Sequence, residues 1–342
     1  MSQNPPVIAI SQLTKKYGDF TALDSLTLSL DSGQILGFIG PNGAGKTTTI
    51  KILVGLASPT SGNASIAGAD CVRNRRQIRR LIGYMPDKFG SYNNMRVHEY
   101  LDFYGSLYGI SYRERTRRID EVLELVRGSY MRDRYVEALS HGMQQRIGIA
   151  RTILHDPPVL ILDEPANGLD PQARIEMREI LLQLATAGKT LIVTSHILSE
   201  LSRICHRVAI VTGGRLRASG SLDEILRQVN QLRLTEVQLA TVETLNKTEG
   251  IIRDFLEPKA EVSISPAECM VRFRSTKSER ELGGLLTKIV ANGVEVLQFR
   301  EGSADLEDAF LSVTSQDRPS DRDLATADQG DRQLAQTIRA QP

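Results

Sequence analysis

The sequence predicts an α/β chain with a parallel sheet and a second, smaller α+β domain, and three patterns lead to this fold class. A short apolar run, Ile35–Ile39, is followed by a glycine-rich loop and a helical stretch, Lys46–Leu56, as at the start of an α/β unit. Two later runs, Val159–Leu162 and Thr190–Val193, are continuous rather than alternating, which is typical of parallel strands buried on both faces. After about residue 230 the predicted strands alternate apolar and polar residues instead.

The other elements of the first half follow in chain order. Two strand-like stretches, Val7–Leu13 and Thr21–Leu30, come first, and the second alternates like a strand with one wet face. The segment Gln172–Ala187 has helical spacing and ends at Gly188, so it forms the crossover between the two continuous strands. Between about residues 88 and 155, apolar residues recur every three to four positions. This spacing predicts an inserted helical subdomain with helices at Val97–Tyr108, Arg113–Val126 and Gly142–Leu154.

The character of the chain changes after residue 230. Strands are predicted there at Leu232–Leu239, Cys269–Phe273 and Val294–Phe299, and a helix at Glu279–Ala291. Residues 316–342 are polar and contain no aromatic residue, which indicates a disordered tail. The expected organisation is therefore a first domain over residues 1–228, a small α+β domain over 229–315 and a tail over 316–342.

The composition excludes several classes of protein. The 342 residues include 42 Lys+Arg and 41 Asp+Glu, whereas a general polyanion-binding protein usually carries a marked basic excess. No apolar run approaches the ~18 residues that span a bilayer, and the N-terminus lacks the pattern of a signal peptide. The three cysteines are far apart and form neither a disulfide framework nor a CxxC metal knuckle. These features predict a chain that works in a reducing cytoplasm.

The most specific motif is the glycine-rich loop, which matches GxxxxGK[ST]. The motif and the residue after it are Gly40, Pro41, Asn42, Gly43, Ala44, Gly45, Lys46, Thr47 and Thr48. Its glycines let backbone N–H groups curl around phosphate oxygens, and the helix that follows points its positive end at the same anion. Lys46 would reach the β- and γ-phosphates of a nucleotide, and the Thr47 hydroxyl would ligate Mg²⁺. Because chance predicts roughly 0.01 such matches in this length, we interpret the loop as a phosphate site.

Two carboxylates and a histidine stand at the ends of the two continuous strands. Asp163 could hold Mg²⁺ directly or through water, and Glu164 could polarise an attacking water as a general base. A turn with solvated acids is the alternative, which the nearby phosphate loop disfavours. Ligands of open α/β sheets gather at the carboxyl ends of strands. His196 would therefore share an edge with the loop, where it could donate to a γ-phosphate or hold the water; a structural histidine is the alternative.

With these residues in place, the chain resembles the ATP-binding subunit of an ABC transporter. That family adds a short signature of the form LSGGQ, which stands here as Leu139–Arg146, about twenty residues before the predicted metal carboxylate. Ser140, Gly142 and the N–H groups of a helix N-terminus would form a second anion site. In the family this site meets the γ-phosphate bound by the other subunit. The resemblance therefore implies that two ATP molecules are enclosed in a head-to-tail dimer.

The resemblance covers residues 7 to about 225 and implies further roles. The family's D-loop matches Gly168–Asp170, which adds Asp170 to the expected nucleotide site. Tyr17 stands where the family places an aromatic that stacks on adenine, and an ordinary strand-end tyrosine is the alternative. The implied fold is a P-loop NTPase with an ABC-type, RecA-like core, an N-terminal antiparallel β subdomain and a helical subdomain. ATP and Mg²⁺ are the implied cofactors.

Within the family, the loop GPNGAGKTT and the extension that ends near Leu306–Leu311 look like the multidrug- and polysaccharide-export type. In that type the ATPase and the membrane subunit are separate chains. The resemblance thus implies an ATP-hydrolysing motor that pairs with a second copy or a close relative and drives a separate permease. The permease would contact the Asp87–Tyr108 region. The chain is then expected on the cytoplasmic face of the cell membrane, without a nucleic-acid partner.

Two other functions are weaker. A soluble ABC ATPase that acts on ribosomes or DNA usually carries two ATPase units in one chain, and this chain has one phosphate loop. A signalling GTPase would need an NKxD motif, and the nearest string, Asn246–Glu249, lies in the second domain. The basic runs Arg73–Arg80 and Arg113–Arg118 lack interleaved aromatics. They are interpreted as solvated helix faces rather than contacts to nucleic acid or to anionic lipid headgroups.

Two positions depart from the family pattern. Asp87 stands where the family has a glutamine that ligates Mg²⁺ and senses the membrane partner. A carboxylate can also ligate Mg²⁺, so we expect Asp87 to keep the metal role and to alter coupling. His141 stands in place of the first signature glycine. It could add a donor to the γ-phosphate or point to solvent, and the sequence leaves both open.

Overall fold

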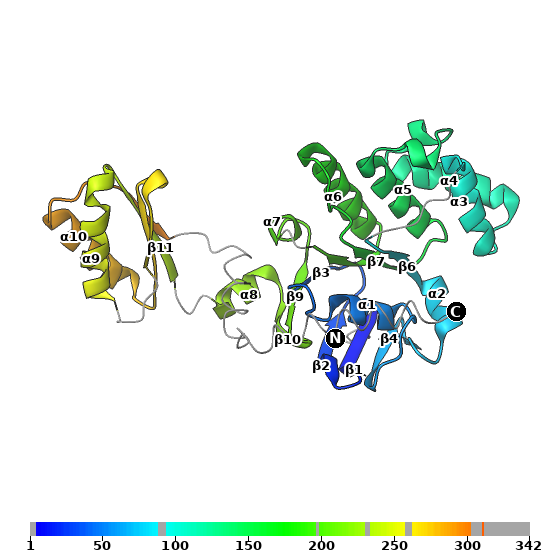
Figure 1. Cartoon of the computed structure of the whole chain (residues 1–342), viewed down its shortest axis with the longest axis horizontal. Helices are drawn as coiled ribbons and strands as arrows, with labels where there is room; N and C mark the ends of the chain where they lie inside the picture. The colour runs from blue at the N-terminus through cyan, green and yellow to red at the C-terminus, as the bar shows by residue number, and fades with distance from the viewer. Residues whose placement is uncertain are drawn as a thin grey trace. The chain divides into compact units, whose positions relative to one another are not determined.

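Figure 1 shows a computed structural model of the chain, which describes residues 5–87, 94–195, 198–229, 233–256, 262–301 and 310. These residues fall into two compact units that divide at Leu222–Asp223, and each unit has a hydrophobic core of its own. The predicted tail over residues 316–342 lies outside the described residues. Among the helices that the structure describes, none combines the length and the apolar character needed to cross a membrane.

The first unit is built on a six-stranded sheet in the order β10-β9-β3-β8-β7-β6. Its strands are β3 (Ile35–Ile39), β6 (Ile82–Met85), β7 (Val159–Asp163), β8 (Thr190–Thr194), β9 (Arg207–Thr212) and β10 (Arg215–Gly220). Neighbouring strands are parallel except at β10, which pairs antiparallel with β9. Strands β3 and β8 are buried at every position, as their continuous apolar sequences predict. The carboxyl ends of β3, β7, β8 and β6 therefore lie at one edge of the sheet.

A second sheet carries the N-terminus, and its strands pair antiparallel in the order β2-β1-β4-β5. Its strands are β1 (Ile8–Tyr17), β2 (Phe20–Leu30), β4 (Ser61–Ile66) and β5 (Ala69–Asp70). Helix α1 (Lys46–Leu53) lies between the two sheets, and one core joins its buried side chains to both (Figure 1). Helix α6 (Pro171–Thr186) covers the opposite face of the six-stranded sheet (Figure 1). The predicted β subdomain and α/β core are thus confirmed.

The predicted helical subdomain is also present. Its helices are α3 (Val97–Leu107), α4 (Tyr112–Leu125) and α5 (His141–Ile153), each within one residue of the predicted bounds at both ends. In helix α4 only the stripe of Ile119, Val122 and Leu123 is buried, and the other residues are half-buried or exposed. The first unit also contains the short helices α2 (Arg75–Leu81) and α7 (Leu198–Leu201), and helix α8 (Leu222–Val229) begins where the two units divide.

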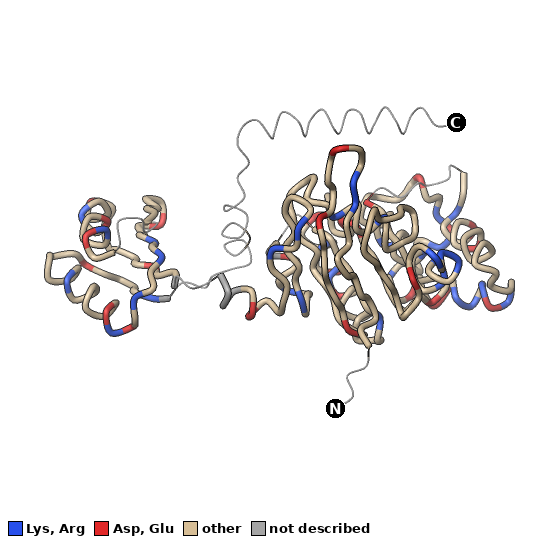
Figure 2. The backbone as a smooth tube through the Cα atoms, turned by 90° about the horizontal axis from the view of Figure 1, so that it is seen from below, with Lys and Arg blue, Asp and Glu red and all other residues tan. Residues whose placement is uncertain are grey.

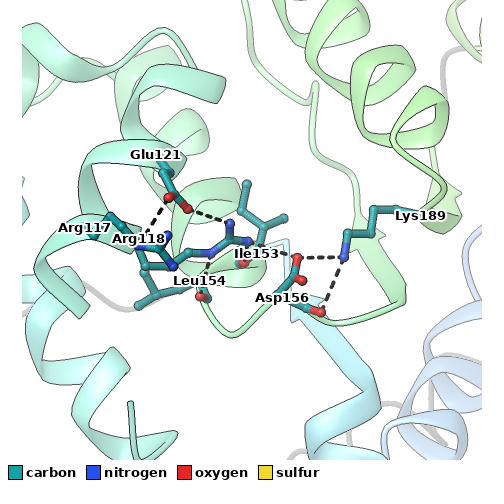
Figure 3. Close-up of polar contacts among 7 residues, drawn as sticks. All are labelled: Arg117, Arg118, Glu121, Ile153, Leu154, Asp156 and Lys189. Carbon is teal, nitrogen blue, oxygen red and sulfur yellow. Dashed lines mark hydrogen bonds and ion pairs between the residues drawn. The ribbon is translucent and has the colours of Figure 1, made fainter. Parts of the chain in front are cut away.

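Several arginines of the basic run Arg113–Arg118 are engaged within the chain. Arg115 forms a 2.6 Å ion pair with Asp102 on α3, and Arg118 pairs with Glu121 and Asp156 (Figure 3). Segments with Lys or Arg and segments with Asp or Glu occur in both units (Figure 2). These contacts favour the structural interpretation of the run.

The second unit is a four-stranded antiparallel sheet with two helices. Its elements are β11 (Arg233–Leu239), α9 (Leu245–Phe255), β12 (Val262–Ser265), β13 (Met270–Ser275), α10 (Glu279–Ala291) and β14 (Val296–Glu301). The strand order β12-β13-β11-β14 is that of a split βαβ, ferredoxin-like fold. Alternate residues such as Val237, Val271 and Phe273 point to the helices and form the core with Ile252 and Leu285. The α+β prediction is confirmed.

Candidate nucleotide site

The loop between β3 and α1 closes because two of its positions have no side chain. A Cβ on Gly40 would stand 2.3 Å from the carbonyl oxygen of Val211. Gly45 has a φ of +103°, and a Cβ there would meet the Leu23 side chain at 2.6 Å. Helix α1 begins directly after Gly45 and has no acidic residue in its first turn. The result is a cradle of backbone at the positive end of a helix, which fits a phosphate group.

Lys46, the first residue of α1, turns back over this loop. Its Nζ donates to the carbonyl oxygens of Gly40 at 2.5 Å and Pro41 at 3.1 Å. Burial lowers the pKa of Lys46, while the charges of Glu164 and Asp163 act in the opposite direction. The fold therefore brings the lysine and both predicted carboxylates near one another, as the sequence predicted.

Asp163 and Glu164 are held by one hydroxyl from the neighbouring strand. Thr194 lies beside Asp163 in the parallel pairing of β7 with β8. Its Oγ1 donates to Asp163 Oδ1 at 2.6 Å and accepts from the backbone N–H of Glu164 at 2.9 Å. Glu164 has a φ of +53°, a left-handed conformation that is uncommon for a residue with a side chain. The hydroxyl thus fixes the first carboxylate and the backbone that presents the second.

Asp87 lies two residues beyond the end of β6, at the same edge of the sheet. Burial raises the pKa of Tyr84 to about 12, and the charges of Asp163 and Asp87 act in the same direction. Tyr84 therefore reports that both carboxylates are near it. Asp87 also accepts a hydrogen bond from Asn167 Nδ2, at 3.4 Å. Asp87, which the resemblance assigned to metal binding, thus lies at the same edge of the sheet as Asp163.

The predicted signature region begins a helix. Ser140 is the N-cap of α5 and accepts from the N–H of Met143 at 3.5 Å, so the predicted helix N-terminus is confirmed. Gly142 lies against α6: a Cβ on it would be 3.5 Å from the Ala173 side chain, an ordinary contact distance. Asp170 is exposed, and its Oδ1 caps α6 by accepting from the N–H of Ala173 at 2.7 Å. Within one chain its carboxylate is thus used by α6.

The remaining residues of the predicted site are Tyr17, the other residues of the phosphate loop and His196. Tyr17 ends β1 in the hairpin that leads into β2, and the Lys15 ammonium lies 4.8 Å from its ring centroid. Pro41, Asn42, Gly43 and Thr47 are exposed, Thr48 is half-buried and Ala44 is buried. His196 lies outside the described residues.

His141 makes a contact within the chain that neither of the two expectations named. Its Nε2 lies 2.8 Å from the carbonyl oxygen of Asn167, so the exposed ring is tied to the turn after Glu164. Sequence reasoning also missed Thr194 and Asn167. Thr194 had a readable signal, because a hydroxyl residue ending the strand next to Asp163 can reach it across a parallel pair. Asn167 had none beyond its place three residues after Glu164.

Comparison with known proteins identifies this arrangement. Residues 23–167 match the family model described as "ABC transporter". The chain is 33% identical over 311 residues to the Nod factor export ATP-binding protein I of Cupriavidus metallidurans, covering 91% of this chain and 98% of that protein. It is 36% identical over 312 residues to the bacitracin transport ATP-binding protein BcrA of Bacillus licheniformis, covering 90% and 97%.

Solved structures agree with the sequence comparison. A structure titled as the ATP binding subunit of an ABC transporter has a TM-score of 0.60 and 33% identity, covering 65% of this chain and 92% of that one. The sequence similarity itself runs along about nine-tenths of the chain and therefore through both of its units. The chain belongs to the ATP-binding proteins of ABC transporters, and it is an ATPase of the kind that drives transport.

Proposed function

We propose that this chain is the ATPase subunit of an exporter, which encloses two ATP molecules between two copies and drives a separate membrane permease. The proposal rests on one observation: Lys46, Asp163 and Glu164 lie near one another beside the phosphate cradle. The direction of transport is supported by relatives named for Nod factor export.

In the proposed reaction the loop Gly40–Thr48 and Lys46 hold the phosphates, and Tyr17 stacks on the adenine. Oxygen ligands suit Mg²⁺, which would be held by Thr47, Asp163 and Asp87 and would neutralise phosphate charge. Glu164 accepts a proton from the attacking water. His196 donates to the γ-phosphate or holds that water.

In the proposed dimer each copy completes the site of the other. Ser140, Gly142 and the N-terminus of α5 face the γ-phosphate held by the partner, with Asp170 nearby. The positive end of α5 supports this role, because it has no acidic residue in its first turn.

The permease would dock on the helical subdomain, at the cytoplasmic face of the membrane. Four large apolar or aromatic side chains are exposed there, close together in sequence on α3, α4 and the turn between them: Phe103, Leu107, Tyr108 and Tyr112, at 36%, 66%, 41% and 74%. Clustered exposed apolar side chains are a mark of protein interfaces.

The test is Glu164→Gln. Loss of the general base should lower kcat for ATP at least about a hundredfold while binding of Mg²⁺-ATP persists. Bound ATP should then hold two copies together, seen as a dimer in gel filtration. Glu243→Gln, an exposed carboxylate of the second unit, is the matched control and should behave as wild type. Hydrolysis by Glu164→Gln at the wild-type rate would refute the assignment.

The transport role has its own experiment. The chain should co-purify in detergent with a membrane protein encoded next to it. Substituting Leu107 and Tyr112 by serine should weaken that complex without changing ATP binding. Failure to co-purify with any membrane protein would favour the soluble, ribosome- or DNA-directed alternative.

A further inference from the structure

The two residues that depart from the family pattern, His141 and Asp87, both contact Asn167. His141 Nε2 donates to the backbone carbonyl oxygen of Asn167 at 2.8 Å, since a carbonyl can only accept. The side-chain Nδ2 of Asn167 donates to Asp87 Oδ1 at 3.4 Å. Asp87 and His141 come from different parts of the unit, the end of β6 and the start of α5. Asn167 therefore joins two sequence changes that looked unrelated.

Asn167 stands in the turn that presents Glu164. Its own N–H donates to the Glu164 carbonyl oxygen at 3.1 Å, which closes the turn. The N–H, the carbonyl and the side-chain amide of Asn167 are thus all used. The next residue, Gly168, has a φ of +69°, and a Cβ there would be 3.2 Å from His141 Nε2. The histidine ring therefore rests directly on this turn.

The side chains at the two departing positions suit the groups of this turn: His141 supplies a donor and Asp87 an acceptor. A glycine at position 141 would offer no side-chain donor to the Asn167 carbonyl. The carboxylate of Asp87 accepts the Asn167 amide in a charge-assisted bond, which a glutamine oxygen at that position would make more weakly. Each change adds a contact to the same turn.

We propose that Asn167 is a positioning residue, and that His141 and Asp87 act with it as one unit that fixes the turn carrying Glu164. One contact comes from the start of α5 and the other from just beyond the end of β6. The proposal rests on the role of Glu164 proposed above. It predicts that the signature helix and the hydrolytic carboxylate are coupled within a single copy, before any partner binds.

The first test measures the turn itself in the free, full-length protein. Hydrogen exchange of the backbone amides of residues 166–169 should quicken about three- to tenfold in Asn167→Ala and in His141→Ala, because each removes one hydrogen bond of ordinary strength. His141→Gln, which can donate to the same carbonyl, should restore the wild-type rate. Asn246→Ala, on an exposed position of α9, is the matched control. Unchanged exchange in both alanine variants would overturn the proposal.

The second test measures catalysis. Asn167→Ala and His141→Ala should each lower kcat about three- to tenfold with the KM for ATP changed less than twofold. The kcat of the double variant should be no more than about twofold below that of the less active single variant, because either single substitution already loosens the turn. If the loss of kcat in the double variant equals the product of the two single losses, the residues act separately and the proposal is overturned.

Glu164→Gln keeps the two claims distinguishable. If it abolishes hydrolysis while the Asn167 and His141 variants exchange and hydrolyse as wild type, the proposed function stands and this inference fails. If Glu164→Gln hydrolyses normally while exchange quickens in the two alanine variants, the turn is held as inferred and the function assigned to Glu164 fails.

Discussion

At the scale of single residues, the hydroxyl of Thr194 contacts both carboxylate-bearing residues of the site. It is fully buried, donates to Asp163 and accepts from the N–H of Glu164. Glu164 keeps its left-handed backbone only where its surroundings compensate the strain. The position of both carboxylates relative to the phosphate cradle therefore depends on this one side chain.

Thr194→Val should separate this role from packing, because valine has nearly the same shape and no hydroxyl. The variant loses both hydrogen bonds and leaves Asp163 without its donor. We expect kcat for ATP to fall about tenfold or more, equivalent to about 1.4 kcal/mol of transition-state stabilisation. Thr194→Ser keeps the hydroxyl and should retain most of the activity. Steady-state kinetics that find Thr194→Val equal to wild type would contradict the role.

The sequence predicted the site's chemical groups better than the contacts that hold them. The phosphate loop and the two carboxylates were readable, because each role demands particular residue types at a fixed local spacing. Thr194 and Asn167 act across a strand pair and across a turn, and such contacts depend on register and tertiary position. His141 shows the limit most clearly: its residue type left a phosphate donor and a solvent-facing ring open, and neither expectation included the backbone carbonyl that it contacts.

At the scale of elements, the end of α5 is held by a side chain of α4. Arg118 Nε donates to the Leu154 carbonyl oxygen at 3.1 Å, and Nη2 donates to that of Ile153 at 3.0 Å (Figure 3). These are carbonyls that a helix end leaves without partners. Asp156 accepts from Arg118 and also from Lys189, which lies just before β8. The helical subdomain is thereby tied to the α/β core at this corner.

Arg118→Ala should therefore destabilise the first unit by about 1–3 kcal/mol, because it leaves partly buried carbonyl oxygens and Asp156 with fewer donors. Arg117, its neighbour on α4, makes one long ion pair of 3.6 Å and has a side chain 72% exposed. Arg117→Ala is thus the matched control and should stay within about 0.5 kcal/mol of wild type. Denaturant unfolding of the two variants measures the difference. Equal stabilities would show that the corner contact carries no net energy.

Some elements with a clear apolar pattern, such as α3 and β8, were predicted from the sequence, whereas β4, β6, β9 and α9 were not. Helix α2 contains most of the basic run Arg73–Arg80, interpreted above as a solvated helix face, and it buries only Ile78, so no apolar stripe marks its bounds. Strand β6 follows α2 without an intervening turn residue. Strand β4 is short and polar with a glycine, which removes the alternation that would reveal it. By contrast, β9 is a continuous apolar run, and its sequence did carry a signal that could have been used.

At the scale of the whole molecule, the described residues of the two units form hydrophobic cores that share no residue. One core surrounds α1 and both sheets of the first unit, and it holds the phosphate cradle between β3 and α1. The other joins α9 and α10 to the ferredoxin-like sheet. A unit with its own core can unfold cooperatively on its own. The nucleotide residues assigned above all belong to the first unit.

We therefore expect two calorimetric transitions in the full chain, only one of which responds to nucleotide. Mg²⁺-ATP at a hundred times its Kd should stabilise the first unit by about 2.7 kcal/mol, because a ligand stabilises the state that binds it. Glu164→Gln should be used so that the ATP survives the scan. Phe273→Ala removes a buried ring of the second core and should destabilise that transition alone, by about 3–5 kcal/mol. A single transition that shifts with both nucleotide and Phe273→Ala would show that the two units unfold together.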